Sequence, residues 1–224
     1  GVAAGSGDAA LVKQAFEVMD AVFIGWARRT GVKEGRNPRA DEVEEMVSFV
    51  ESGLTEKYSK LRGLGIEVDV ELLLATVTDD GKPLLYGFDS RGIVELRHDT
   101  PGYALLGRGM MTGGLVLLKL LAFSPEKAQG WDMGLLAAFL IDTVSEVDPS
   151  VSPFMGESYF IRYDEDQKRV IAGPLSEEAF RGYKDEVKAR RDLIEQLWSV
   201  TEGLEEKGEE RVARALERLS KQKA

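Results

Sequence analysis

The middle of the sequence constrains the fold most, because residues 70–77 form a mostly apolar run that is followed at once by strong turn residues. A run of this length and composition predicts a β-strand that is covered on both faces. The turn, residues 78–83, contains Asp-Asp-Gly, which is typical of a β-hairpin. Residues 84–88 predict the returning strand, and residues 93–98 a third strand. The sequence therefore predicts an antiparallel meander, with residues 103–106 as a short fourth strand.

Apolar residues with helical spacing precede this meander. They predict one amphipathic helix that begins after Asp8, which would be its N-cap, and ends near Thr30 and Gly31. A second amphipathic helix is expected to end before residue 63. At the start of the chain, residues 1–4 are typical of the end of a buried strand, and residues 5–8 of a turn.

The second half of the chain repeats this combination of helices and strands. Helices are predicted over residues 112–123 and 132–147. A final hairpin is predicted from residues 158–163 and 169–172. Helices that lie between blocks of antiparallel strands indicate an α+β fold, with helices outside stacked sheets.

The C-terminal part differs, because nearly half of its residues from Ser176 onward are charged. It predicts one long helix to about Thr201 and a second helix over residues 205–220. Charge runs of this kind are usually solvated helix faces with ion pairs between neighbouring turns. The alternative is a docking arm for a partner subunit.

Composition excludes several classes of function. The sequence contains no cysteine, which excludes disulfides, thiolate metal sites and cysteine nucleophiles. Its single histidine, His98, leaves little basis for a metal cluster or a Ser-His-Asp triad. A formal net charge of -10 argues against nucleic-acid binding, which needs a basic face. The longest apolar stretches are too short to span a bilayer, so we expect no membrane insertion. The absence of cysteine fits a reducing cytosol, so we expect a cytoplasmic protein. We also expect no cofactor, because no convincing nucleotide-binding loop is present.

Three segments of the chain resemble the proteasome family of N-terminal-nucleophile (Ntn) hydrolases. Residues 3–9, AAGSGDA, are similar to the family's A-G-x-x-x-D turn between a strand and a helix. Residues 82–92, KPLLYGFDSRG, follow the apolar residues 72–75 and resemble the family's P-x-L-Y-x-x-D-x-x-G meander. Residues 103–109, YALLGRG, resemble the Y-x-A-x-G-S-G turn that precedes the family's next helix.

This resemblance covers residues 1–172 and implies a four-layer α/β/β/α sandwich, incomplete at the N-terminus. We therefore expect a proteasome-like Ntn-hydrolase domain at residues 1–175, with its front strands missing, and a charged helical C-terminal extension at residues 176–224. The family's chemistry implies an N-terminal threonine nucleophile whose own amine acts as base, tuned by a lysine and an aspartate. All three precede the A-G-x-x-x-D turn, so none has a counterpart in this sequence.

Gly5 matches the family glycine whose backbone N–H donates a hydrogen bond to the oxyanion. A preorganised N–H beside the start of a helix would stabilise the negative charge that develops there. The alternative interpretation is that Gly5 only permits a tight turn.

Three further residues belong to the site that the resemblance implies. Arg108 lies where active family members usually carry a serine that hydrogen-bonds the nucleophile region. A long cation changes the local pKa balance, so this departure favours an inactive or chemically diverged relative. Asp148 and Ser152 fall near a D-x-x-S loop that supports the family's site, with a spacing one residue longer and with Pro149 and Pro153 altering the loop. The alternative is a simple loop that ends a helix.

Two functions follow from the resemblance. The first is an archaeal-type, proteasome-related Ntn hydrolase that acts on a peptide or protein substrate through an acyl-enzyme, which water or another amine resolves. The second is a non-catalytic ring or scaffold subunit, which Arg108 and the charged C-terminal helices favour. Without the resemblance, the chain would be an unrelated α/β interaction module.

The missing front strands would leave sheet edges exposed, and open edges promote aggregation. We therefore expect a partner at those edges, which would be a separate N-terminal segment, another subunit or a helix from the C-terminus. An oligomer is the expected form, with neither nucleic acid nor membrane as a partner.

Overall fold

The computed structural model describes residues 1–31, 37–99, 101–128, 130–153 and 158–201. Its strands are β1 (Val2–Gly7), β2 (Val70–Val77), β3 (Pro83–Phe88), β4 (Val94–Leu96), β5 (Tyr159–Asp164) and β6 (Arg169–Pro174). Its α-helices are α1 (Ala9–Thr30), α2 (Ala40–Gly63), α3 (Leu115–Leu120), α4 (Met133–Ser145) and α5 (Glu177–Thr201). A π-helical turn, η1 (Met110–Gly114), leads directly into α3. The α+β class is therefore confirmed.

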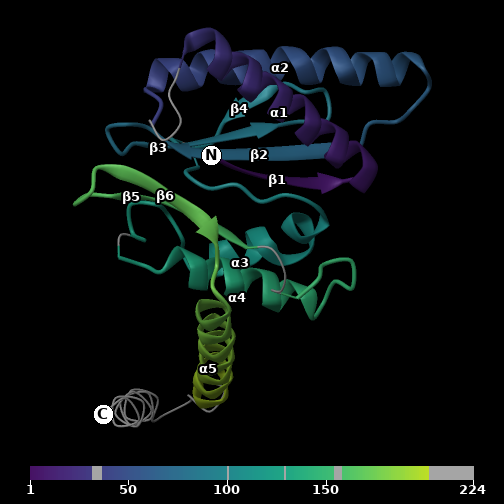
Figure 1. Cartoon of the computed structure of the whole chain (residues 1–224). Coiled ribbons are helices and arrows are strands. Elements are labelled where there is room, and N and C mark those ends of the chain that lie inside the picture. The colour runs from purple at the N-terminus through teal and green to yellow at the C-terminus, as the bar shows by residue number, and fades with distance from the viewer. Residues whose placement is uncertain (32–36, 100, 129, 154–157, 202–224) are drawn as a thin grey trace.

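Strands β1 to β4 form one antiparallel sheet in the order β1-β2-β3-β4 (Figure 1). Side chains alternate between the two faces of a strand, so Val70, Leu72 and Leu74 share one face of β2, where all three are buried. Phe88 of β3 lies opposite Leu72 and is buried with it. The apolar run of the sequence thus forms an inner strand of the sheet, as predicted.

Helices α1 and α2 cover this buried face of the sheet (Figure 1). Each helix turns a stripe of apolar side chains toward the sheet. Gly53 lets the two helices approach closely, because a Cβ atom there would lie 2.9 Å from Val18 Cγ1. The core between helices and sheet consists of Leu11, Ala15, Met19, Val43, Val47, Val50, Leu54, Tyr58, Val68, Val70, Leu72, Leu74, Leu84, Tyr86 and Phe88.

Helix α1 begins and ends where the sequence predicts. The Asp8 carboxylate accepts hydrogen bonds from two amides of the first turn, at 2.9 and 3.0 Å. At the other end Gly31 adopts a left-handed conformation with φ of 65° and ends the helix. Gly7 makes the bend from β1 into α1 with φ of 112°, and a Cβ atom there would lie 1.9 Å from the Asp69 carbonyl oxygen. Only glycine fits this bend.

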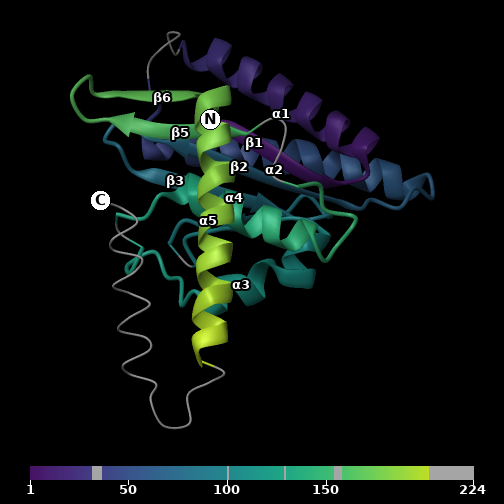
Figure 2. The ribbon, with the colours of Figure 1, turned by 90° about the horizontal axis from the view of Figure 1, so that it is seen from below.

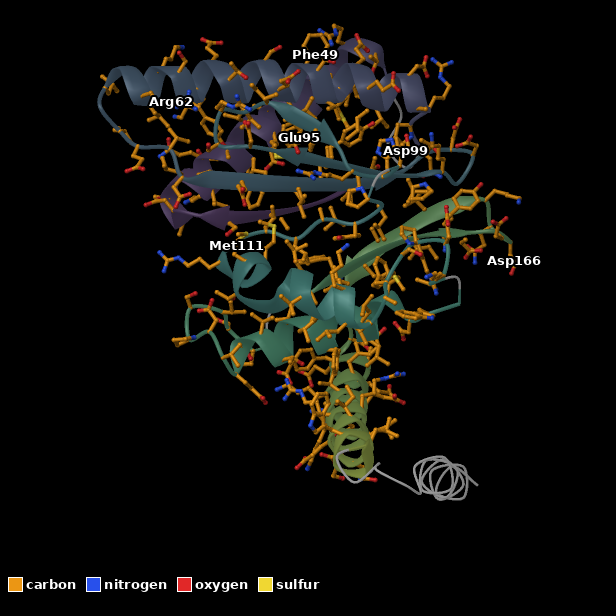
Figure 3. The ribbon with its side chains drawn as sticks, turned by 180° about the vertical axis from the view of Figure 1, so that it is seen from behind. Phe49, Arg62, Glu95, Asp99, Met111 and Asp166 are labelled. Carbon is orange, nitrogen blue, oxygen red and sulfur yellow. The ribbon has the colours of Figure 1, made fainter. Side chains whose placement is uncertain are left out.

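The β5–β6 hairpin, η1, α3 and α4 lie on the side of the sheet opposite α1 and α2 (Figure 1). In Figure 3, Phe49 of α2 and Met111 of η1 mark these two sides. Strands β5 and β6 pair with each other as a separate antiparallel sheet, and β5 lies against β1 and β2. The Tyr163 hydroxyl donates to the Asp79 carbonyl at 3.2 Å, which links the hairpin to the turn between β2 and β3.

Helix α5 packs against α4 and then extends away from the sheets (Figures 1 and 2). Val187 is buried with Leu135 and Phe139 of α4. The Tyr183 hydroxyl donates to Asp132 Oδ1 at 3.1 Å, and the same oxygen caps α4 by accepting the Leu135 amide at 3.1 Å. Asp132 therefore both starts α4 and holds α5 against it.

The predicted turn at residues 5–8 is wrong. Strand β1 continues through Gly5 and bends only at Gly7, because the ladder with β2 extends to the Gly7–Val70 pair. The alternative that Gly5 serves a tight turn fails for the same reason.

The predicted fourth strand at residues 103–106 is also wrong. The chain turns back at Gly102, whose amide donates to the Arg97 carbonyl at 2.8 Å, and then leaves the sheet. The helix expected over residues 112–123 begins earlier, at Met110, as the π-helical turn, and α3 ends at Leu120.

The C-terminal predictions have mixed outcomes. Helix α5 is confirmed with the expected bounds, whereas the helix predicted over residues 205–220 lies outside the described residues. A domain boundary between residues 175 and 176 stays a prediction. In the described part of the chain, no helix is long and apolar enough to cross a membrane.

We predict that Asp132→Ala lowers the free energy of unfolding by about 1–2 kcal/mol, because the change removes an N-cap and the acceptor of the Tyr183 hydroxyl together. Urea denaturation followed by circular dichroism measures this change. Asp185→Ala, which removes an exposed carboxylate from α5, is the matched control and should stay within about 0.5 kcal/mol of the wild type. Equal stabilities of the two variants would contradict the role of Asp132.

Candidate functional site

A pocket of about 240 Å³ lies where β1, the loop before η1 and the loop after α4 meet. Its polar lining includes Ser6 of β1, Arg108 before η1 and Ser150 after α4. An apolar hollow with a few convergent polar groups is typical of a ligand-binding site. We call it the Ser6–Arg108 pocket. Its aliphatic lining consists of Leu105, Leu106, Met110, Leu140, Ile141, Val144 and Val151.

Glycines bring the loop before η1 close to β1 and to the loop after α4. Gly107 has φ of 77°, and a Cβ atom there would lie 2.5 Å from Ser6 Oγ. A Cβ atom at Gly109 would lie 2.9 Å from Val151 Cγ2. The pocket therefore depends on the absence of side chains at these two positions.

The π-helical turn η1 continues this close packing. The Leu115 amide donates to the Met110 carbonyl, which is the hydrogen bond that defines a π-helix. A Cβ atom at Gly113 would lie 2.9 Å from Val144 Cγ2 of α4. Such turns are rare and are frequently found at functional sites.

Asp148 lies beside the pocket and is buried, with its carboxylate bound by neighbouring donors. Its Oδ1 atom accepts hydrogen bonds from the Ser150 hydroxyl at 2.6 Å and from the Ser150 amide at 2.9 Å. These bonds, followed by the nearby Thr112 hydroxyl and by attraction from the Arg108 guanidinium, hold the pKa of Asp148 below its ordinary value of 3.8. Asp148 is therefore a carboxylate at neutral pH.

Arg108 combines a fixed backbone with an exposed side chain. Its carbonyl accepts the Thr112 hydroxyl at 3.3 Å, and the flanking Gly107 carbonyl accepts the Met110 amide at 3.1 Å. Among the described residues, no salt bridge or side-chain hydrogen bond occupies its guanidinium. The rim of the pocket therefore carries a guanidinium that pairs with no carboxylate among the described residues.

Gly5 presents its backbone to the open edge of the sheet. The Asp8 amide donates to the Asp69 carbonyl at 3.0 Å, and hydrogen-bonded pairs alternate along an antiparallel ladder. Gly5, which pairs with Leu72, therefore turns its N–H away from β2, toward the edge that no described strand occupies. Its Cα faces α1, since a Cβ atom there would lie 2.6 Å from Val12 Cγ1. Close packing against α1 is thus the reason for glycine at this position.

The structure brings only some of the predicted site residues together. Arg108 lines the pocket, and Asp148 lies outside the lining but interacts electrostatically with Arg108 and is bound by Ser150 of the lining. Ser152 is exposed and outside the pocket lining. Sequence reasoning missed Ser6 and Ser150. The Asp-x-Ser spacing of residues 148 and 150 is a local signal of a side chain that binds its own backbone two residues on. No local signal could place Ser6 against the loop before η1.

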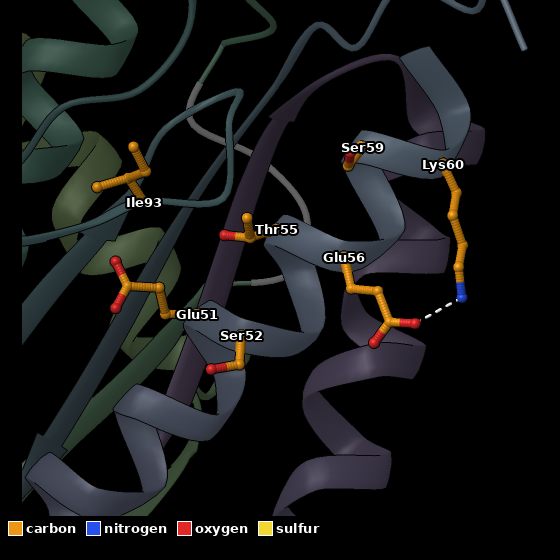
Figure 4. A pocket seen from close by; sticks show the side chains of 7 residues that line it. All are labelled: Glu51, Ser52, Thr55, Glu56, Ser59, Lys60 and Ile93. Carbon is orange, nitrogen blue, oxygen red and sulfur yellow. Dashed lines mark hydrogen bonds and ion pairs between the residues drawn. The ribbon is translucent and has the colours of Figure 1, made fainter. Parts of the chain in front are cut away.

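A second hollow lies along α2, beside the loop that carries Ile93 (Figure 4). Its Glu56 and Lys60 form an ion pair at 2.5 Å between successive helical turns. The hydrogen bond from Lys60 lowers the pKa of the exposed Glu56, as an ordinary surface pair does. This hollow therefore shows no convergence of functional groups, and we do not assign it a function. It is lined by Glu51, Ser52, Thr55, Glu56, Ser59, Lys60 and Ile93.

The single histidine is a structural residue. His98 Nδ1 lies 3.1 Å from the Leu85 carbonyl oxygen, and its ring packs edge-on against Tyr86 with centroids 5.4 Å apart. In the part of the chain that the structure describes, no three His, Asp or Glu residues are grouped to hold a metal ion. Neither a histidine base nor a metal centre is therefore present among the described groups around the pocket.

Comparison with known proteins identifies the fold. No family model matches the sequence, and no curated protein matches it. A mutant Anbu from Hyphomicrobium sp. strain MC1 matches with a TM-score of 0.61 and 15% identity, over 88% of this chain and 77% of that one. Anbu, the ancestral beta-subunit, from Yersinia bercovieri matches with a TM-score of 0.56 and 14% identity, over 88% and 78%.

A helical assembly of the Anbu complex from Pseudomonas aeruginosa contains a third similar chain. Its TM-score is 0.53 and its identity is 16%, over 87% of this chain and 78% of that one. Identities this low show a shared fold alone.

These structures correct the resemblance that the sequence motifs indicate. The identification of the chain as a proteasome-family subunit is wrong, because the similar solved structures described above are Anbu proteins, a proteasome-like but distinct family. The chain shares its fold with Anbu.

We predict that Gly107→Ala lowers the free energy of unfolding by about 1–2 kcal/mol or more, because alanine is strained at positive φ and its Cβ atom would collide with Ser6. Thermal denaturation followed by circular dichroism measures the effect. Gly182→Ala in α5, where a Cβ atom meets nothing within 4 Å, is the control and should be neutral or stabilising. If both changes have the same sign, Gly107 does not hold the loop.

We also predict that Ser150→Ala raises the pKa of Asp148, because it removes the hydroxyl donor that lowers this pKa most. A carboxylate with a depressed pKa stabilises the fold at pH values above 3.8, and this stabilisation is lost as the pH falls through the lower pKa of the folded state. Ser150→Ala should therefore shift acid unfolding to higher pH. Carbon-detected NMR titration measures the pKa directly. Ser152→Ala is the control, and an equal shift in that variant would contradict the assignment.

Proposed function

We propose that this chain forms part of an Ntn-type amide hydrolase or acyl transferase with the Anbu fold, and that the Ser6–Arg108 pocket lies in its active site. The observation that carries this proposal is that Ser6, which lines the pocket, belongs to β1, the strand at the open edge of its sheet. The likeness to Anbu, the ancestral beta-subunit, supports the same class of protein.

In this proposal a further strand pairs with the outer edge of β1 and carries the nucleophile. Unpaired N–H and C=O groups along an edge strand provide a template for such pairing. Added strands would complete a proposed four-layer α/β/β/α arrangement of helices α1 and α2, the two sheets, and helices α3 and α4 (Figure 1). The added strand comes from outside the described residues or from another subunit.

The chemistry of the pocket favours a nucleophile that brings its own base. Ser6 lines the pocket, but His98 is engaged elsewhere, at Leu85 and Tyr86. Asp148 is a poor base because its pKa is depressed. An N-terminal threonine or serine solves this problem, since its free amine accepts the proton of its own hydroxyl.

The proposed reaction proceeds through an acyl-enzyme. The nucleophile's oxygen adds to the amide carbon, and the carbonyl oxygen becomes negatively charged. The Gly5 N–H, which faces the open edge, is the proposed donor to this oxygen. The C–N bond then breaks, the leaving amine takes the proton, and water or another amine releases the acyl group.

Asp148 and Arg108 have supporting roles in this proposal. Asp148 keeps a fixed negative charge beside the pocket, which favours the protonated amine of the nucleophile during the reaction. Arg108 provides a positive charge at the rim. Ser152 is exposed, and we give it no role.

Assembly with other subunits is part of the proposal, since the Anbu from Pseudomonas aeruginosa forms a helical assembly. The substrate would be a peptide or a protein. The proposed location is the cytoplasm, with which a sequence without cysteine is in keeping.

A peptide epoxyketone tests the proposal, because it bonds to the hydroxyl and the amine of an N-terminal threonine together. We expect the protein purified whole from its source cells to gain the mass of one probe per active subunit, measured by intact mass spectrometry. Asp148→Asn should slow this labelling at least about tenfold, because it removes the charge that favours the protonated amine.

N-terminal sequencing of the same sample identifies the nucleophile. Acetylation of the terminal amine before labelling is the control, since it removes the base and should prevent the mass gain. A natural protein without a terminal Thr, Ser or Cys in any of its subunits, and without a probe adduct, would sink the proposal.

A further inference from the structure

We infer that the Ser6–Arg108 pocket binds a peptide carboxylate, with the carboxylate on the Arg108 guanidinium and a neighbouring aliphatic side chain in the hollow. This inference rests on the proposed function, because the bound peptide would be its substrate or product. It names the chemical group that this site selects.

The Arg108 guanidinium is available to bind an anion. Arg108 is exposed at the rim of the pocket, and no carboxylate among the described residues forms a salt bridge with it. Other arginines of the chain have such partners; Arg91 and Arg191, for example, pair with Asp89 and Asp142. A guanidinium presents a planar fork of donors that matches a carboxylate, so an unoccupied one beside a cavity is suited to an anionic ligand.

The Asp148 carboxylate does not form a salt bridge with the Arg108 guanidinium, although it lies nearby. Its Oδ1 accepts both the hydroxyl and the amide of Ser150. Arg108 acts on Asp148 only through electrostatic attraction, without a salt bridge within 4 Å. The buried carboxylate is satisfied by hydroxyl and amide donors, and the guanidinium is left for a ligand.

Arg108 lies on a loop whose backbone is closely packed on both sides of this residue. Gly107, with φ of 77°, packs on Ser6, and Gly109 packs on Val151. The backbone on either side of Arg108 is therefore held against β1 and against the loop after α4. A fixed backbone reduces the conformational entropy lost when the side chain binds a ligand.

The lining of the pocket identifies the group next to the carboxylate. Apart from Ser6, Arg108 and Ser150, the side chains in the lining are aliphatic, and the pocket volume is about 240 Å³. An aliphatic side chain of a peptide would enter this hollow and lose its contact with water. The net charge of -10 makes the rest of the surface unfavourable for an anion, so binding should depend on Arg108.

The carboxylate has two sources in a peptide, which are the C-terminus and an acidic side chain. Three unlabelled, N-acetylated tripeptides distinguish them: Gly-Ala-Leu with a free C-terminus, the same peptide with a C-terminal amide, and Gly-Leu-Glu with a C-terminal amide. Isothermal titration calorimetry with the whole natural protein measures the Kd of each.

We expect at least one peptide that carries a carboxylate to bind, and Arg108→Gln to weaken that binding about tenfold or more. Arg108→Lys should give a smaller loss, because it keeps the charge without the fork. Arg28→Gln removes an exposed arginine from α1 and is the matched control, with unchanged binding. Equal melting temperatures of the three variants show that each is folded.

Binding of the free acid alone assigns the C-terminal carboxylate, and binding of the Glu peptide assigns an acidic side chain. The inference is overturned if no peptide with a carboxylate binds, if the uncharged amide binds as tightly, or if Arg108→Gln has no larger effect than Arg28→Gln. The assay needs no nucleophile, so failure of the carboxylate site and failure of the proposed catalysis give different results.

Discussion

The open outer edge of β1 is the constraint on which the proposed site depends. β1 is an edge strand of its sheet. Its residues Ala3, Gly5 and Gly7 turn their N–H and C=O groups away from β2. Open edges of this kind pair readily with other chains. Because Ser6 of the same strand lines the pocket together with Arg108, a strand added to this edge would lie next to a strand of the pocket.

Small residues in β1 permit close packing on both of its faces. β1 has the sequence VAAGSG, which leaves little side-chain volume between the helices on one side and the loop before η1 on the other. Gly5 allows α1 to approach one face, whereas Ser6 meets Gly107 on the other face. The strand thus connects the apolar core under α1 and α2 to the chemistry of the pocket. A larger residue at Gly5 would push α1 away from β1, and one at Gly107 would push the loop before η1 away from Ser6.

The sequence predicts the elements whose signals are local, and it fails where tertiary contacts decide. Strand β2 and the Asp8 cap follow from an apolar run and a capping side chain, and both are confirmed. The π-helix at Met110–Gly114 was missed, because glycines packed against Val144 and Val151 determine it. Arg108 and Asp148 were found through a resemblance to proteasome subunits that itself needs correction to Anbu. Ser6 was missed, since only the folded chain places it at Gly107.

Amide hydrogen exchange along β1 in the whole natural protein tests the central claim most directly. NMR spectroscopy measures the exchange of each amide separately. The inner amides of Ala4 and Ser6, which face β2, serve as the internal reference. If a further strand covers the outer edge, the amides of Ala3 and Gly5 exchange as slowly as this reference. If they exchange at the rate of unprotected amides while the inner set stays protected, no strand pairs with β1, and the proposed active site is contradicted.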